Sequence, residues 1–221
     1  MLFTTLPLLL VHSLVTNYMY AITPTSSQLY TYADIYYAMI TLLFYLYAQV
    51  PYIRYIYNEH IGIENNLRNT IYQFLVNGFT VFLFSCIISI IATIGFALFL
   101  LPGLILFTIV FPIPYISVFD EKSVWKSYRE GIRIGKKYFF KIILVIIGIG
   151  SIELLFGILV TFQLFNITSS FAAQIVTQMV LNLLVFPFIV MLMSSNILKW
   201  REEQEVLNFG NEEEAKDEMA G

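Results

Sequence analysis

Apolar residues along this chain gather into long runs that short polar stretches separate. The runs cover residues 2–20, 35–55, 72–101, 104–119, 142–165 and 171–198. Because about 20 apolar residues in an α-helix cross the hydrocarbon core of a bilayer, most of the runs have the length of a membrane span. The pattern predicts an all-α protein, a polytopic transmembrane helical bundle of about six spans that forms a single domain over residues 1–198.

Two of the runs depart from a simple straight span. The third run is about 30 residues long, which predicts that its helix tilts or begins among the lipid headgroups, after an interfacial helix over 58–70. Pro102 and Gly103 follow this run and predict a turn. Pro112 and Pro114 interrupt the fourth run, and because each removes a backbone donor they predict a kinked or broken helix.

Basic residues occupy three short stretches that lie between or after the apolar runs. All 12 Lys and Arg residues fall within 54–68, 122–141 and 199–216. If each stretch lies on the cytoplasmic side, every external loop lacks Lys and Arg, as the positive-inside rule requires. We therefore expect a multi-pass protein of the cytoplasmic membrane, with the C-terminus and the 120–141 segment in the cytoplasm.

The 120–141 segment has the periodicity of an amphipathic helix. Six basic residues share one face of it: Lys122, Lys126, Arg129, Arg133, Lys136 and Lys137. The opposite face is largely apolar, which predicts a basic interfacial helix that contacts the anionic phospholipids of the bilayer. The alternative is that these charges only fix the topology. No nucleic-acid partner is expected, because a basic strip between two spans has an adequate membrane explanation.

Composition supports the membrane assignment and sets the last segment apart. Hydrophobic residues make up 58% of the chain and charged residues 12%, whereas soluble domains carry about 45–50% and about 25%. Residues 199–221 hold eight acidic and three basic residues. The sequence therefore predicts an acidic, disordered cytoplasmic tail after the last span.

Glu153 is the acidic residue that lies deepest within a predicted span. Folding the fifth and sixth spans back on each other about residues 166–170 brings Glu153 level with Asn182 and one helical turn from Gln178. Because carboxylates inside a membrane are costly and often functional, we hypothesise an intramembrane polar site formed by these three residues. The alternative is a protonated Glu153 that only joins two helices by a hydrogen bond.

Recognisable catalytic motifs are missing from the sequence. His12, His60 and Cys86 are isolated from one another and do not have metal-ligand spacing. The sequence holds no Walker loop, no GxSxG and no GxGxxG motif. We therefore expect no enzymatic activity, no metal and no cofactor.

Part of the chain resembles a known bacterial membrane module. Pro102 and Gly103 lie between two apolar runs, the acidic pair Asp120 and Glu121 ends the second run, and a basic helix follows. This order is similar to the membrane domain found beside the catalytic domain of some glycerophosphodiester phosphodiesterases, and to stand-alone six-span proteins, over residues 58–200. The resemblance implies a six-helix bacterial inner-membrane protein but brings no established activity.

The sequence therefore favours an integral membrane protein with a non-enzymatic accessory or regulatory role and a membrane-protein partner. The missing catalytic motifs, the basic helix and the acidic tail motivate this expectation. The alternative is a small transporter or lipid-handling protein that uses the polar site around Glu153. A hydrolase ranks third, because no catalytic set is visible.

Overall fold

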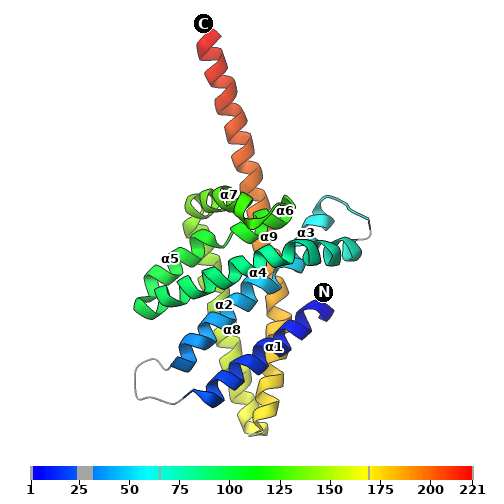
Figure 1. Cartoon of the computed structure of the whole chain (residues 1–221), viewed down its shortest axis with the longest axis vertical. Coiled ribbons are helices and arrows are strands. Elements are labelled where there is room, and N and C mark those ends of the chain that lie inside the picture. Colours follow the sequence, from blue (N-terminus) through cyan, green and yellow to red (C-terminus); the bar gives the residue numbers. More distant parts are fainter. Residues whose placement is uncertain (1, 24–31, 65, 169, 221) are drawn as a thin grey trace.

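The computed structural model describes residues 2–23, 32–64, 66–168 and 170–220, with side chains described between residues 5 and 204. This part of the chain is helical throughout and contains no strand, so the expected all-α class is confirmed. The helices are α1 (Leu2–Ile22), α2 (Tyr32–Ala48), α3 (Val50–His60), α4 (Asn66–Leu98), α5 (Leu100–Val110), α6 (Ile113–Phe119), α7 (Val124–Lys137), α8 (Phe139–Ile167) and α9 (Phe171–Ala220) (Figure 1).

Six helical segments of the described chain are long and apolar enough to cross a membrane, which makes this a multi-pass membrane protein. Four of them are α1, α4, α8 and the first part of α9, while α2 with α3 and α5 with α6 form the other two. The second segment runs from Tyr32 to His60 and is longer than the predicted 35–55. Its interruption at Gln49 comes two residues before Pro51, which lies in the first turn of α3, where a missing backbone donor costs little.

The third and fourth segments form a helical hairpin whose turn differs from the expected one. The turn lies at Phe99, whose backbone is extended, three residues before Pro102. Pro102 and Gly103 instead lie in the first turn of α5, where proline loses no intrahelical hydrogen bond. Gly103 serves close packing rather than the turn, because a Cβ on Gly95 would lie only 2.9 Å from the Gly103 Cα atom.

The separate interfacial helix expected over 58–70 is also not formed. Its first residues belong to α3 and its last residues are the start of α4, a single helix of 33 residues. Because a helix rises 1.5 Å per residue, α4 is about 50 Å long, well beyond the ~30 Å hydrocarbon core. Figure 1 shows α4 and α5 steeply inclined to α8 and α9, as a helix of this length requires.

The fourth segment is broken where its two prolines lie. Helix α5 ends at Val110, Pro112 is the N-cap of α6, and Pro114 occupies the first turn of α6. Short α6 is buried along its whole length. The break therefore allows the chain to turn from a membrane span into the protein core.

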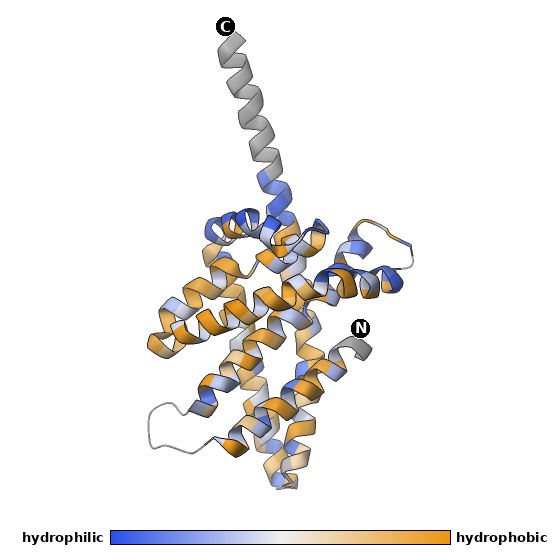
Figure 2. Ribbon diagram, viewed as in Figure 1, coloured by the Kyte–Doolittle hydropathy of each residue, from blue (hydrophilic) through white to orange (hydrophobic). Residues whose placement is uncertain are grey.

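The densest core lies at one end of the bundle, where α3, α6 and α7 meet the middle parts of α4 and α9. We call this the charged end, because most Lys and Arg residues of the described chain lie on the helices that meet there. Figure 2 shows hydrophilic residues gathered at this end. Helix α7 packs very closely here: a Cβ added to Gly131 would lie 2.6 Å from Ile113 Cγ1, and one added to Gly135 would lie 2.1 Å from the Ile109 oxygen. The basic helix is therefore fixed directly on the broken fourth span.

The opposite end, which we call the far end, is formed by α1, α2, α8 and the start of α9 and is packed more loosely. Most of the side chains on α8 are exposed, including Leu154, Leu155 and Phe156. In a bilayer these apolar side chains face lipid, which satisfies them without protein contacts.

Helix α9 differs from the expected tail. It continues as a helix to Ala220 and projects beyond the bundle (Figure 1), whereas the acidic composition predicted disorder from residue 199. Glu, Ala and Lys are strong helix formers, and the segment follows an existing helix, so no new nucleation is needed.

Candidate functional site

Glu153 lies near the middle of α8 and its carboxylate points toward α2. Tyr45 of α2 donates a hydrogen bond from its hydroxyl to Glu153 Oε1, with the oxygens 3.1 Å apart. Tyr45 itself packs edge-on against the ring of Phe186 on α9, with centroids 5.4 Å apart. The carboxylate is thus held between three helices rather than facing lipid alone.

The two predicted partners of Glu153 lie nearby on α9 but hydrogen-bond to each other. Gln178 Nε2 donates to Asn182 Oδ1 over 3.2 Å. Gln178 and Glu153 line the same cavity, which has a volume of about 560 Å³ and which we call the side cavity. The structure therefore brings Glu153 and Gln178 to one space, while the hydrogen bond to Glu153 comes from Tyr45, which sequence reasoning missed.

A second cavity, the far-end cavity, has a strongly polar wall made by α1, α2, α8 and α9. It measures about 300 Å³ and is lined by His12, Asn17, Gln174, Gln178 and Asn182 among others. His12 Nε2 lies 3.0 Å from Thr41 Oγ1, within hydrogen-bond distance. Sequence reasoning set His12 aside as an isolated histidine, although the spacing of polar residues along α1 indicates a polar helical face.

A third space, the inner cavity, lies deeper in the bundle and measures about 310 Å³. Its polar lining residues are Thr41, Tyr45, Gln49 and Glu153. Gln49 is 2% exposed, and its Nε2 has no hydrogen-bond partner among the described residues. A buried amide donor without a partner is unfavourable by roughly 1–3 kcal/mol, so Gln49 marks this cavity as a place where a ligand acceptor would be stabilised.

The three cavities adjoin one another through shared residues. Gln178 and Thr161 line both the far-end cavity and the side cavity. Glu153 and Gly150 line both the side cavity and the inner cavity. The three spaces therefore lie next to one another between the far end and the middle of the bundle, and Glu153 lies between the side cavity and the inner cavity.

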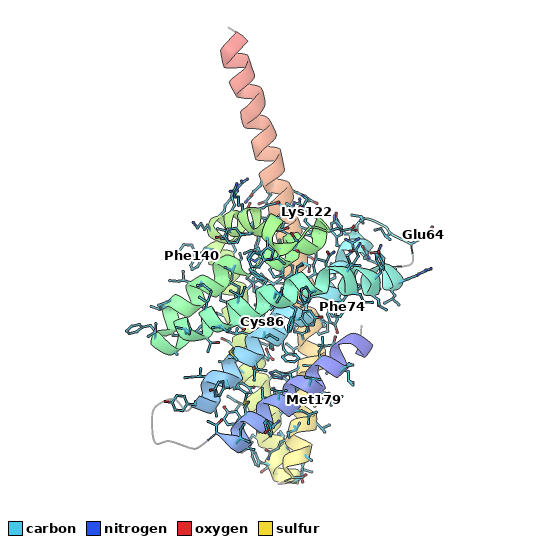
Figure 3. The ribbon with its side chains drawn as sticks, in the orientation of Figure 1. Glu64, Phe74, Cys86, Lys122, Phe140 and Met179 are labelled. Atoms are coloured by element: carbon cyan, nitrogen blue, oxygen red, sulfur yellow. The ribbon has the colours of Figure 1, made fainter. Side chains whose placement is uncertain are left out.

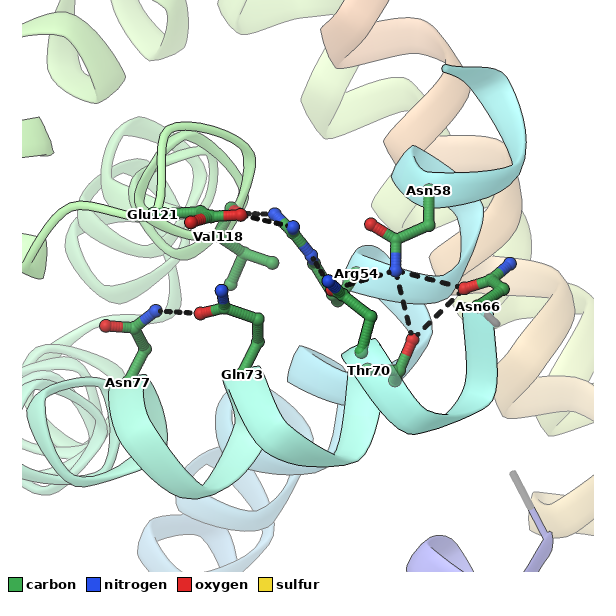
Figure 4. A network of polar contacts seen from close by, with 9 residues as sticks. Arg54, Asn58, Asn66, Thr70, Gln73, Asn77, Val118 and Glu121 are labelled. Atoms are coloured by element: carbon green, nitrogen blue, oxygen red, sulfur yellow. Dashed lines mark hydrogen bonds and ion pairs between the residues drawn. The ribbon is translucent and has the colours of Figure 1, made fainter. Parts of the chain in front are cut away.

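The charged end holds a second polar cluster, centred on Arg54 of α3 (Figure 4). This side chain is 2% exposed and donates to Asn69 Oδ1 over 3.1 Å, to the Val118 carbonyl over 3.2 Å and to the carboxylate of Glu121. Asn58 extends the cluster by donating to the same Asn69 oxygen at 3.2 Å. Arg54 thereby ties α3 to α4 and to the chain that leaves α6.

Asp120, next to Glu121, binds the middle of α9. Asp120 pairs with Arg201 of α9 at 2.6 Å and with Lys122 at 2.9 Å, and Arg201 also pairs with Glu130 of α7 at 3.0 Å. Burial by itself raises the pKa of Asp120, but the hydrogen bonds and charges of Lys122 and Arg201 outweigh it and lower the pKa. The Asp120–Glu121 pair thus joins α3, α6, α7 and α9.

An aromatic pair reinforces the connection to α9. The rings of Tyr138 and Trp200 stack with centroids 4.8 Å apart, and the Tyr138 hydroxyl donates to Glu203 over 3.0 Å. Burial and the nearby Glu203 carboxylate raise the pKa of Tyr138. The Nζ atoms of Lys137 and Lys141 lie over the Tyr138 ring, 5.4 and 5.2 Å from its centroid.

The predicted lipid-contacting residues all lie on the surface of the charged end. Five of them are on α7, and all five are exposed: Lys126, Arg129, Arg133, Lys136 and Lys137. Lys122 precedes α7, which begins at Val124, and it pairs with Asp120 instead of extending the helical face (Figure 3). The prediction that Lys122 belongs to this face is therefore wrong, because the chain bends at Glu121, where φ is +52°.

Within the described residues, no group of three or more His, Cys, Asp or Glu side chains is arranged to hold a metal ion. The chemistry that the interior offers is a carboxylate, several amides and hydroxyls, and aromatic rings. These groups suit the recognition of a small polar molecule. No protein family, curated protein or solved structure matches the chain.

Proposed function

We propose that this protein binds a small solute in the cavities between α1, α2, α8 and α9, as a small transporter or a lipid-handling protein. The observation that carries the proposal is the position of Glu153, a carboxylate in the middle of a span that borders two adjoining cavities. Ionisable residues within membrane spans commonly mark substrate or ion pathways. The sequence alone favoured an accessory role, and the cavities change that preference.

The packing of the bundle supports a site that is open toward one side. The cavities lead inward from the far end, while fully buried side chains fill the charged end, among them Ile113, Tyr115 and Ile134. A site reached from one side and closed on the other is one of the two states that alternating access requires. The loosely packed α8 is the element best placed to move, because few protein contacts hold it.

Native mass spectrometry of the full chain, extracted gently from its own membranes, tests the proposal. The wild-type protein should retain a low-mass ligand at about one per chain, and Glu153→Gln should lose it. Ser151→Ala is the matched control, because Ser151 is exposed on the same helix two residues away. If neither the wild type nor the control retains a ligand, or if Glu153→Gln retains it equally, the proposal is wrong.

A second candidate function is the accessory or regulatory role, acting through a membrane-protein partner. The observation that favours it is the extension of α9 beyond the bundle, joined to the core by Arg201 and Trp200 (Figure 1). Crosslinking in native membranes followed by purification tests it. A stoichiometric second protein whose recovery depends on the α9 extension would support this role over solute binding.

For the orientation, we propose that the charged end faces the cytoplasm of a bacterial cell and that the exposed basic side chains of α7 contact anionic phospholipids. The distribution of Lys and Arg supports this orientation. A reporter that fluoresces only in the cytoplasm, fused after Gly221, should be bright. A dark fusion that is nevertheless full length would reverse the orientation.

A further inference from the structure

The inner cavity combines one carboxylate with a wall of aromatic rings. Four rings line it, contributed by Tyr45, Phe107, Phe111 and Phe186. Two pairs of these rings are in contact, Tyr45 with Phe186 and Phe107 with Phe111, each with centroids 5.4 Å apart. Aromatic faces carry partial negative charge and attract cations most strongly where water is excluded.

The charge of Glu153 has no basic partner in this region. No Lys or Arg lines the side cavity, the far-end cavity or the inner cavity. The sequence contains none within 1–53, 69–121 or 142–198, which include the spans that form the site. A carboxylate in this setting is stabilised either by a proton or by a cation that arrives from outside the protein.

The lining groups of the inner cavity do not fit a calcium or magnesium ion. Calcium takes six to eight oxygen ligands and magnesium demands six in octahedral geometry. The inner cavity offers one carboxylate and three further polar side chains, and its remaining lining is apolar or aromatic. This composition suits a cation whose charge is spread over an organic body.

The size of the inner cavity and the amide of Gln49 restrict the ligand further. At about 310 Å³ the cavity has the volume of a small-molecule site. Gln49 Nε2 is buried, lines this cavity and has no partner among the described residues. A ligand with a hydrogen-bond acceptor would satisfy this donor, while its positive group approaches Glu153.

We propose that the inner cavity binds a monovalent organic cation that carries an apolar body and one hydrogen-bond acceptor. This inference rests on the proposed solute-binding function and names the class of solute. Access from the far end agrees with it, because Asp34, which accepts a hydrogen bond from Tyr20, is the charged residue described near that end. A negatively charged entrance raises the local concentration of cations.

Binding of benzoylcholine to the purified full chain in lipid nanodiscs tests the inference. Benzoylcholine carries a quaternary ammonium group, an ester acceptor and a phenyl ring. Its uncharged carbon analogue, 3,3-dimethylbutyl benzoate, has nearly the same shape and serves as the matched ligand. Wild type should bind the cation at least tenfold more tightly than the analogue, and Glu153→Gln should remove that preference.

Two further variants separate the contribution of each group. Gln49→Leu should weaken benzoylcholine binding several-fold, while it leaves the preference for the cation over the uncharged analogue intact. Ser151→Ala should behave as wild type. Unchanged binding of the uncharged analogue by Glu153→Gln shows that this variant is folded, so its loss of cation preference reports on charge.

The outcomes distinguish this inference from the broader function. Equal binding of the cation and its uncharged analogue by wild type would overturn the inference. An uncharged or anionic ligand retained in native mass spectrometry would also overturn it, while the solute-binding function would stand. Absence of any retained ligand together with absence of benzoylcholine binding would remove both.

Discussion

Replacing Arg54 with methionine tests whether the polar cluster at the charged end stabilises the fold. Methionine keeps much of the length of the side chain but makes none of the three hydrogen bonds of Arg54. The buried Val118 carbonyl loses this partner, which costs about 1–3 kcal/mol. Glu121 is 48% exposed and is solvated in the variant, so loss of the ion pair adds only about 1 kcal/mol. We expect the free energy of unfolding to fall by about 2–4 kcal/mol.

Unfolding by SDS in mixed micelles measures this change, with circular dichroism for helix content and the fluorescence of Trp125 and Trp200 for the charged end. Arg68→Met is the matched control, because Arg68 is exposed on α4 and its loss should cost less than about 0.5 kcal/mol. Glu121→Gln should cost measurably more in the wild type, where it leaves the buried Arg54 charge unpaired, than in Arg54→Met. Equal costs for Arg54→Met and Arg68→Met would refute the reasoning.

Three other predictions concern packing, pH and lipid at the same end. Gly135→Ala should destabilise the fold by about 1–3 kcal/mol because its Cβ would overlap a backbone oxygen of α5, whereas Gly148→Ala, where a Cβ meets open space, should be neutral or slightly stabilising in the same SDS assay. The lowered pKa of Asp120 increases the free energy of unfolding above pH 3.8. Acid titration in micelles should show this contribution lost as the pH falls below 3.8, and Asp120→Asn should not show that loss. Replacing Lys126 and Lys136 together by Gln should reduce the number of anionic lipids that co-purify, counted by native mass spectrometry, and an unchanged count would contradict the proposed lipid contact.

The helical fold was predictable because the bilayer imposes strict lengths on apolar segments. Six runs gave six segments able to cross a membrane, and the strongly periodic basic stretch became α7. The ends of the helices were harder to predict. Helix α4 begins in a polar stretch, and α9 continues through an acidic one. Once a helix has formed, adjoining residues with good helix propensity extend it without a new nucleation step, whatever their polarity.

The turn between α4 and α5 illustrates the limits of local signals. Pro102 and Gly103 have the composition of a turn, yet the chain reverses at Phe99. Proline is equally favourable at the start of a helix, and glycine equally serves close packing between helices. Local composition could not distinguish a turn from a helix start or a packing contact. The deciding observation is the close approach of Gly95 and Gly103, which lie on two different helices.

The interior site was only partly predictable. Glu153, Gln178 and Asn182 stood out because polar residues are rare in spans, and the structure places Glu153 and Gln178 beside one cavity. Tyr45 and Gln49 did not stand out, because their importance depends on which face of α2 meets α8. Their spacing of four residues puts them on one helical face, and this was the signal that could have found them. The resemblance to the bacterial membrane module stays a prediction.

The burial of Arg54 was also not predictable from the sequence. Its position fitted the positive-inside pattern, which counts charges without regard to burial. The structure instead buries it among hydrogen-bond acceptors of α4 and α6. A single sequence offers no sign of this, because an exposed and a buried arginine at the boundary of a membrane span have the same composition around them.

One continuous helix joins the inner cavity to the charged end. We therefore predict that a change at the charged end alters ligand binding in the inner cavity. Helix α9 carries Phe186 at the inner cavity and Arg201 at the charged end, about 23 Å apart along the helix. Pro187 lies between them and removes one backbone hydrogen bond, which makes it the natural bending point.

Because Arg201 anchors the outer part of α9 to Asp120 and Glu130, releasing that anchor should let the helix bend and widen the cavity. We therefore expect Arg201→Gln to weaken benzoylcholine binding about threefold or more, although Arg201 lies far from the ligand, while the exposed Lys199→Gln leaves it unchanged. Linkage requires the reverse effect as well: saturating benzoylcholine should favour the anchored position of α9 and so reduce the amount of bent helix in Arg201→Gln. Identical affinities in the two variants would show that α9 does not transmit the change, and that the cavity and the charged end act independently.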